Sequence, residues 1–200
     1  MKTYLKTNRP KISLILISIL FISNILFSLI PELREMALLY PSNLSEPLNW
    51  YRLITYPLYV GGLSTWIQNS LVIILTGFII ENKVKKKDLI GLILLSTIIG
   101  GLVCIIFNQG EEYNIPIATP TMITWGYWSA TIIIGLKYWR TLNLFEKIVM
   151  ILCFLSISSI GNDNIGFLLG QVSVIITVAI LTMVKYRKAS SPPINQIPEL

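Results

Sequence analysis

Residues 63–80 read Leu-Ser-Thr-Trp-Ile-Gln-Asn-Ser-Leu-Val-Ile-Ile-Leu-Thr-Gly-Phe-Ile-Ile and contain no charged side chain. An α-helix rises about 1.5 Å per residue, so this stretch nearly crosses a hydrocarbon core of about 30 Å. Backbone N–H and C=O groups in lipid need partners within the same segment, which a helix supplies. The stretch therefore predicts a transmembrane helix over Leu63–Ile80.

Five more apolar runs of similar length occur along the 200 residues, of which 54% are hydrophobic and only 13% charged. They cover Ile12–Ile30, Leu89–Phe107, Ile117–Leu136, Leu142–Ile160 and Asn164–Val184. The sequence thus predicts an all-α membrane protein with six transmembrane helices and a long first extracytoplasmic loop from Pro31 to Gly62. We expect a basic N-terminus (1–11), a membrane domain (12–185) and a disordered tail (186–200).

The segments between the runs alternate in charge. Those on one side sum to +10 and those on the other to −4. Because positive segments stay in the cytoplasm, both termini are predicted to be cytoplasmic. The first run could instead be a signal peptide, but its length and the lack of small residues near Pro31 favour a retained span. A composition rich in Ile, Lys and Asn is typical of AT-rich bacteria, so we expect a bacterial inner (plasma) membrane.

The chain contains no His, which excludes Ser-His and Cys-His dyads, HExxH zinc sites and His-ligated haem. Cys104 and Cys153 lie inside apolar runs, so they are expected to be buried hydrophobic residues. We expect no cofactor and no metal. The basic residues, among them the run Lys83–Lys87, sit between apolar runs without interleaved aromatic residues, which indicates membrane topology rather than nucleic-acid binding. Membrane lipids are the expected partners, and specific binding of anionic lipid by this run is a second interpretation.

Several motifs in a fixed order resemble the rhomboid intramembrane serine proteases. They are Trp50-Tyr-Arg52 in the first loop, Asn69 in the second run, Gly77-Phe-Ile-Ile-Glu81 at its end, Gly126 in the fourth run and Gly166-Phe-Leu-Leu-Gly170 in the last run. The resemblance implies that Glu81 accepts hydrogen bonds from the following loop. It also implies that the Gly166/Gly170 pair lets the last span lie against the fourth. Trp50 and Arg52 are expected at the outer interface, with Arg52 within reach of phosphates.

The sequence departs from this family at the catalytic positions. Placing Gly126 on the family's glycine puts Pro116-Ile-Ala118-Thr119 where rhomboids have Gly-x-Ser-Gly. Counting back from Gly166 puts Asp163 at the position of the catalytic His. The two other His positions of the family fall on Thr65 and near Val60.

Three functions remain open from the sequence. The first is a catalytically inactive pseudoprotease that binds transmembrane segments, in which Asn69 makes an interhelical hydrogen bond or remains from an oxyanion site. The second is an active serine-type endopeptidase with a nonstandard pair, Thr119 and Asp163, although a carboxylate is a weak base toward an alcohol. The third is a small transporter or channel, disfavoured because no run carries a charge near its centre. Ser129 is expected to hydrogen-bond between helices.

Overall fold

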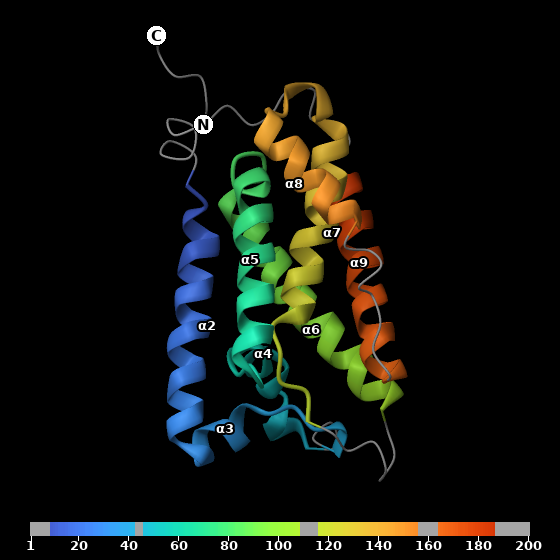
Figure 1. Cartoon of the computed structure of the whole chain (residues 1–200). Coiled ribbons are helices and arrows are strands. Elements are labelled where there is room, and N and C mark those ends of the chain that lie inside the picture. The colour runs from blue at the N-terminus through green and yellow to red at the C-terminus, as the bar shows by residue number, and fades with distance from the viewer. Residues whose placement is uncertain (1–8, 43–45, 109–115, 156–163, 187–200) are drawn as a thin grey trace.

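The computed structural model of the chain describes residues 9–42, 46–108, 116–155 and 164–186, and it is a bundle of helices (Figure 1). The helices are α2 (Lys11–Leu29), α3 (Pro31–Ala37), η2 (Pro47–Asn49), α4 (Arg52–Thr55), η3 (Tyr56–Leu58), α5 (Leu63–Ile80), α6 (Lys86–Phe107), α7 (Thr121–Lys137), η5 (Trp139–Thr141), α8 (Leu144–Leu155) and α9 (Ile165–Tyr186). Within the described residues, β-structure is limited to one isolated bridge between Leu39 and Ile117. The all-helical fold class is thus confirmed.

Four of these helices, α2, α5, α6 and α9, are long and apolar enough to cross a membrane. The other two predicted spans are shorter: α7 has 17 residues and α8 has 12. The fifth predicted span continues to Ile160, and residues 156–160 lie outside the described residues. Of the predicted tail, Tyr186 is the last residue of α9, and residues 187–200 lie outside the described residues.

Helix α7 begins at Thr121, later than the predicted start at Ile117. Ile117 instead exchanges backbone hydrogen bonds with Leu39, at N–O distances of 2.8 and 3.3 Å. Pro116 and Pro120 flank this segment, and proline lacks the N–H that a helix interior requires. The segment before α7 is therefore extended and tied to the first loop.

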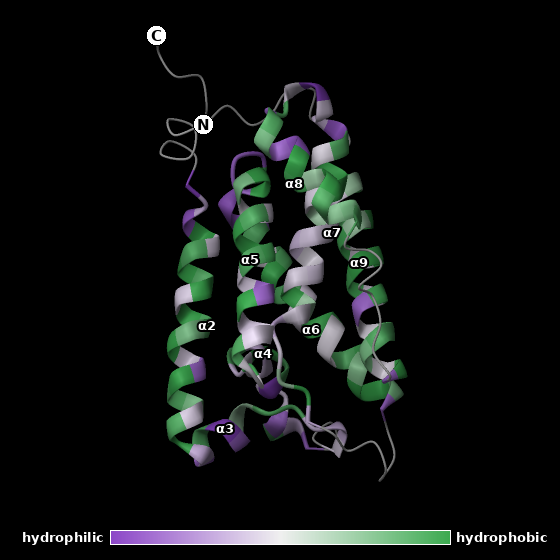
Figure 2. Cartoon of the chain, viewed as in Figure 1, coloured by the Kyte–Doolittle hydropathy of each residue, from purple (hydrophilic) through white to green (hydrophobic). Residues whose placement is uncertain are grey.

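Helix α7 is the centre of the bundle, because it contacts α5, α6, α8 and α9. Nearly all of its residues are buried, although several are polar or small. Figure 2 shows the consequence: the middle of α7 is paler than the strongly hydrophobic α2. Such small and polar residues are common where helices meet inside a membrane, while the outer helices present apolar side chains to lipid.

Glycines set the closest contacts between the long helices. A Cβ placed on Gly170 of α9 would lie 2.9 Å from the carbonyl oxygen of Gly100 in α6. A Cβ on Gly166 would collide with the Asn108 side chain just after α6, and one on Gly126 of α7 with Ser96 of α6. The last span lies against the fourth, as expected, since α9 contacts α7, but the closest backbone approach of Gly170 is to α6 rather than to the fourth span. The cause is Gly100, which lacks a side chain at the same level.

Glu81 and Gly77 together hold the first helix. The Glu81 carboxylate accepts hydrogen bonds from the Ile12 and Ser13 backbone N–H groups at 2.9 and 2.7 Å, and from the Ser13 hydroxyl at 2.7 Å. The expectation that Glu81 accepts hydrogen bonds from the following loop is therefore wrong. Its donors lie on α2, because the first turn of any helix has unpaired N–H groups that favour a nearby negative charge. Gly77 leaves room for the Ser13 side chain. The Gly77–Glu81 motif thus docks α2 on α5.

At the opposite end of the bundle, the first loop packs beneath α5 and α6 (Figure 1). Arg52 donates to the carbonyl oxygens of Glu35 and Leu38 at 2.9 and 2.8 Å, so this guanidinium holds the end of α3. Tyr56 is fully buried and donates to the Thr97 carbonyl of α6 at 3.0 Å. Burial raises the pKa of Tyr56 well above its ordinary value, which keeps the phenol a neutral donor. Trp50 is 56% exposed, as suits an interfacial residue.

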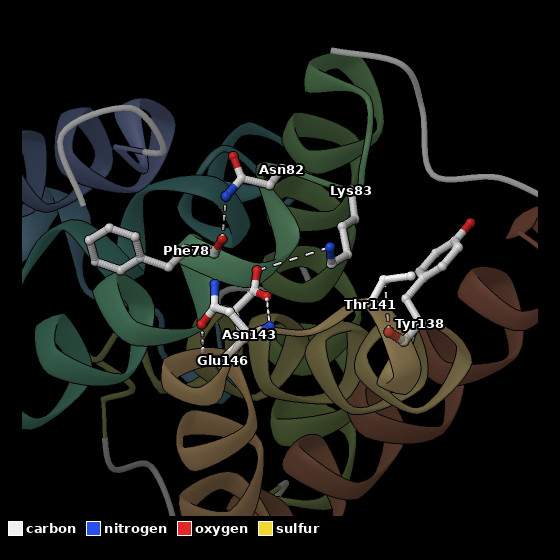
Figure 3. A network of polar contacts seen from close by, with 7 residues as sticks. All are labelled: Phe78, Asn82, Lys83, Tyr138, Thr141, Asn143 and Glu146. Atoms are coloured by element: carbon white, nitrogen blue, oxygen red, sulfur yellow. Dashed lines mark hydrogen bonds and ion pairs between the residues drawn. The ribbon is translucent and has the colours of Figure 1, made fainter. Parts of the chain in front are cut away.

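A buried ion pair joins the connection between α5 and α6 to the start of α8 (Figure 3). It lies at the end of the bundle opposite α3 and α4, which we call the basic end. Lys83, between α5 and α6, and Glu146, in the first turn of α8, are 7% and 3% exposed, with 4.0 Å between Nζ and Oε1. Asn143 and Glu146 also form a reciprocal cap: the Asn143 N–H donates to Glu146 Oε2 at 2.9 Å, and the Glu146 N–H to Asn143 Oδ1 at 3.0 Å. Lys83, the first lysine of the basic run, therefore faces the protein interior.

Replacing Gly170 by Ala should destabilise the protein by about 1–3 kcal/mol, because the added methyl meets the α6 backbone. Gly91→Ala in α6 is the matched control, since a Cβ there meets nothing within 4 Å. Alanine favours a helix over glycine by about 1 kcal/mol, so the control should be neutral or stabilising. The measurement is reversible unfolding in mixed detergent micelles. Equal effects of the two substitutions would contradict the close α6–α9 contact.

Candidate functional site

A small polar cavity lies between α5, α7 and α9. Its volume is about 220 Å³, and its lining is Thr65, Gln68, Asn69, Val72, Thr121, Thr124, Trp125, Trp128 and Gln171. The α5 and α7 contributions each follow the spacing i, i+3, i+4, i+7, which places them on one face of each helix. Hydroxyls, amides and indoles thus converge between α5, α7 and α9.

Asn69 occupies the wall of this cavity with both ends of its amide engaged. Its Oδ1 accepts a hydrogen bond from the Thr124 hydroxyl of α7 at 2.6 Å, and its Nδ2 donates to the Thr65 carbonyl at 2.8 Å. The side chain is 7% exposed. This is the interhelical hydrogen bond expected from an amide at this position. Thr124, which the sequence reasoning did not single out, is its partner.

Gln171 on α9 is a second buried amide of the cavity that sequence reasoning missed. It is 4% exposed, and its Oε1 has no hydrogen-bond partner among the described residues. A buried acceptor of this kind favours a donor from outside the bundle, such as a ligand group. The sequence feature that points to this residue is a glutamine directly after Gly170 inside an apolar run.

Ala118, the position aligned with a catalytic serine, and its neighbour Thr119 lie just before α7, where Thr119 contacts the cavity-lining residue Thr121. Ala118 and Thr119 belong to the extended segment before α7. The Thr119 hydroxyl lies 2.6 Å from the Thr121 hydroxyl and accepts the Thr121 N–H at 3.3 Å. Asp163 lies outside the described residues, so its pairing with Ala118 or Thr119 stays a prediction. Thr65 lines the cavity, whereas Val60 is buried elsewhere and donates its N–H to Asn24.

Two α7 side chains near the cavity serve packing. Ser129 donates its hydroxyl to the Ile175 carbonyl of α9 at 2.8 Å, which confirms the predicted interhelical hydrogen bond. Trp128 donates its indole N–H to the Cys153 carbonyl of α8 at 2.8 Å. These bonds tie α8 and α9 to α7.

The motifs and the cavity lie within a region that a family model matches. The model described as the Rhomboid domain covers residues 47–184. The chain belongs to the rhomboid family. A search of curated proteins and a search of solved structures returned no match. The sequence contains no His, and among the described residues no titratable side chain lines the cavity. The described groups that line it can donate and accept hydrogen bonds.

A double-mutant cycle should detect the bond between Asn69 and Thr124. Asn69→Ala and Thr124→Val each remove one partner, and their coupling in unfolding free energy should be about 0.5–1.5 kcal/mol, as for hydrogen bonds between membrane helices. Asn69→Ala combined with Ser129→Ala is the control, because Ser129 bonds a different helix. That control pair should be additive within about 0.5 kcal/mol. Additivity of the first pair as well would contradict the interhelical bond.

Proposed function

We propose that this rhomboid-family membrane protein is a pseudoprotease that binds transmembrane segments without cleaving them. The observation that carries the proposal is the absence of His from a matched rhomboid domain. A serine or threonine hydroxyl needs an adjacent base to become a nucleophile, and an ordinary carboxylate such as Asp163 is a weak one. Ala118 at the aligned serine position and the hydrogen-bonded state of Asn69 agree with this reading.

The shape of the bundle supports binding of a transmembrane segment. Helix α5, which carries four of the nine residues that line the cavity, presents Leu63, Ile67 and Leu71 outward, each at least half exposed. Polar groups at this depth give an arriving helix hydrogen-bond partners that lipid cannot offer. A client helix lying on the outer face of α5 would be next to Gln68 and Asn69.

We propose further that all six apolar helices span the membrane with both termini in the cytoplasm. The central position of α7 and the continuation of the fifth apolar run beyond Leu155 support six spans. The basic residues support the orientation, because Lys83, Lys137 and Lys147 share the end of the bundle that lies opposite α3 and α4 (Figure 1).

Inactivity has a direct test in liposomes. The reconstituted protein should neither cleave a fluorogenic transmembrane substrate nor react with a fluorophosphonate serine probe, while an active rhomboid in the same vesicles does both. Labelling that disappears in Thr119→Val or Ser129→Ala would establish a nucleophile and refute the pseudoprotease proposal.

Binding is tested in the same vesicles with a photo-crosslinking residue. Placed at Leu71 on α5, it should capture a labelled transmembrane peptide more strongly than the same residue at Leu94 on α6, which is similarly exposed. Equal capture at the two positions would argue against a client site on α5.

The orientation is tested by labelling single cysteines with a membrane-impermeant thiol reagent. With Cys104 and Cys153 replaced by Ala, Leu48→Cys should be labelled on intact spheroplasts, because Leu48 is 89% exposed in the first loop. Lys86→Cys at the other end should react only after the membrane is opened. The reverse pattern would overturn the proposed topology.

A further inference from the structure

A second, larger groove lies at the basic end of the bundle, away from the polar cavity. Its volume is about 470 Å³, and it runs between α6 and α9. Leu92 and Leu95 of α6, Ala130 of α7, and Val178 and Leu181 of α9 form apolar walls. Lys87 and Lys185 lie at its basic end. The groove therefore combines apolar walls with positive charge at one end.

Gly91 keeps this groove open. A Cβ placed on Gly91 would meet nothing within 4 Å, whereas a Cβ on Gly100, Gly126 or Gly170 would collide with a neighbouring helix. Glycine at position 91 is thus not needed for helix packing, although glycine costs about 1 kcal/mol in a helix interior relative to alanine. What its missing side chain provides is space along the groove wall.

A polar network fixes the charged end of the groove. Asp88 accepts a hydrogen bond from Lys185 Nζ at 2.5 Å and from the Tyr186 hydroxyl at 2.8 Å. These bonds tie the end of α9 to the start of α6. Two lysines and one aspartate leave a net positive charge, and the exposed side chains of Lys85 and Lys86 add to it nearby.

We propose that this groove binds one anionic glycerophospholipid of the bilayer, with an acyl chain beside Gly91 and Leu95 and the phosphate at Lys87 and Lys185. The apolar walls match an acyl chain, and basic pockets between helices at the cytoplasmic face suit anionic headgroups. A free phosphate would use only the lysines and leave the apolar walls exposed. The site is independent of the polar cavity and of the proposed pseudoprotease function.

The test is native mass spectrometry of the purified full-length protein titrated with dioleoyl phosphatidylglycerol or dioleoyl phosphatidylcholine. The phosphatidylglycerol should bind more tightly. Gly91→Leu should abolish this preference by filling the groove, with unfolding behaviour in the absence of added lipid as the check on folding. Lys87→Gln should weaken phosphatidylglycerol binding about fivefold, in line with about 1 kcal/mol per lysine near an anionic surface.

Lys11→Gln is the matched control, because Lys11 is exposed on α2, which docks on α5 rather than on α6 or α9. It should leave phosphatidylglycerol binding unchanged. Equal binding of the two lipids, full binding by a folded Gly91→Leu variant, or equal losses in Lys11→Gln and Lys87→Gln would overturn the proposal. Saturation by sn-glycerol 3-phosphate alone at the same concentrations would also overturn it, since the acyl chain would then be unnecessary.

Discussion

Close approach of helix backbones is the constraint on which this bundle depends. Lipid is as apolar as leucine, so burying leucine against leucine provides little force between helices in a membrane. Here four close contacts are made where a glycine lets a neighbour enter: Gly77 receives Ser13, Gly126 receives Ser96, Gly135 receives Met150, and Gly170 meets the Gly100 backbone. These four contacts join α2 to α5, α6 and α8 to α7, and α9 to α6.

Much of the fold was predictable, because hydropathy and charge report directly on what lipid permits. The ends of α2, α5 and α9 lie within a few residues of the apolar runs. The start of α7 was not predictable from hydropathy, because Ile117 is as apolar as a span residue and only its bridge to Leu39 shows that it is extended. The partner of Gly170 was also missed, since a small residue indicates close approach without identifying the helix that approaches. Glu81 shows the same limit: its structural role was expected, but its donors on α2 required the tertiary arrangement.

The candidate site was likewise predictable only in part. Asn69 was predictable as an interhelical group, since an amide in a span needs a partner. Its actual partner Thr124 and the buried Gln171 were not, because threonine and glutamine in apolar runs do not reveal which faces they share. The cavity exists only because faces of α5, α7 and α9 coincide, and these helices are far apart in the sequence.

The buried pair of Lys83 and Glu146 constrains how the chain can be assembled. Lys83 precedes α6, whereas Glu146 is synthesised only after α6 and α7 are complete. Until then the lysine has to remain hydrated among the lipid headgroups, because a lone ammonium is costly to bury. Closure of the basic end is therefore a late event of biogenesis, in which two successive helical hairpins dock and neutralise each other's charge.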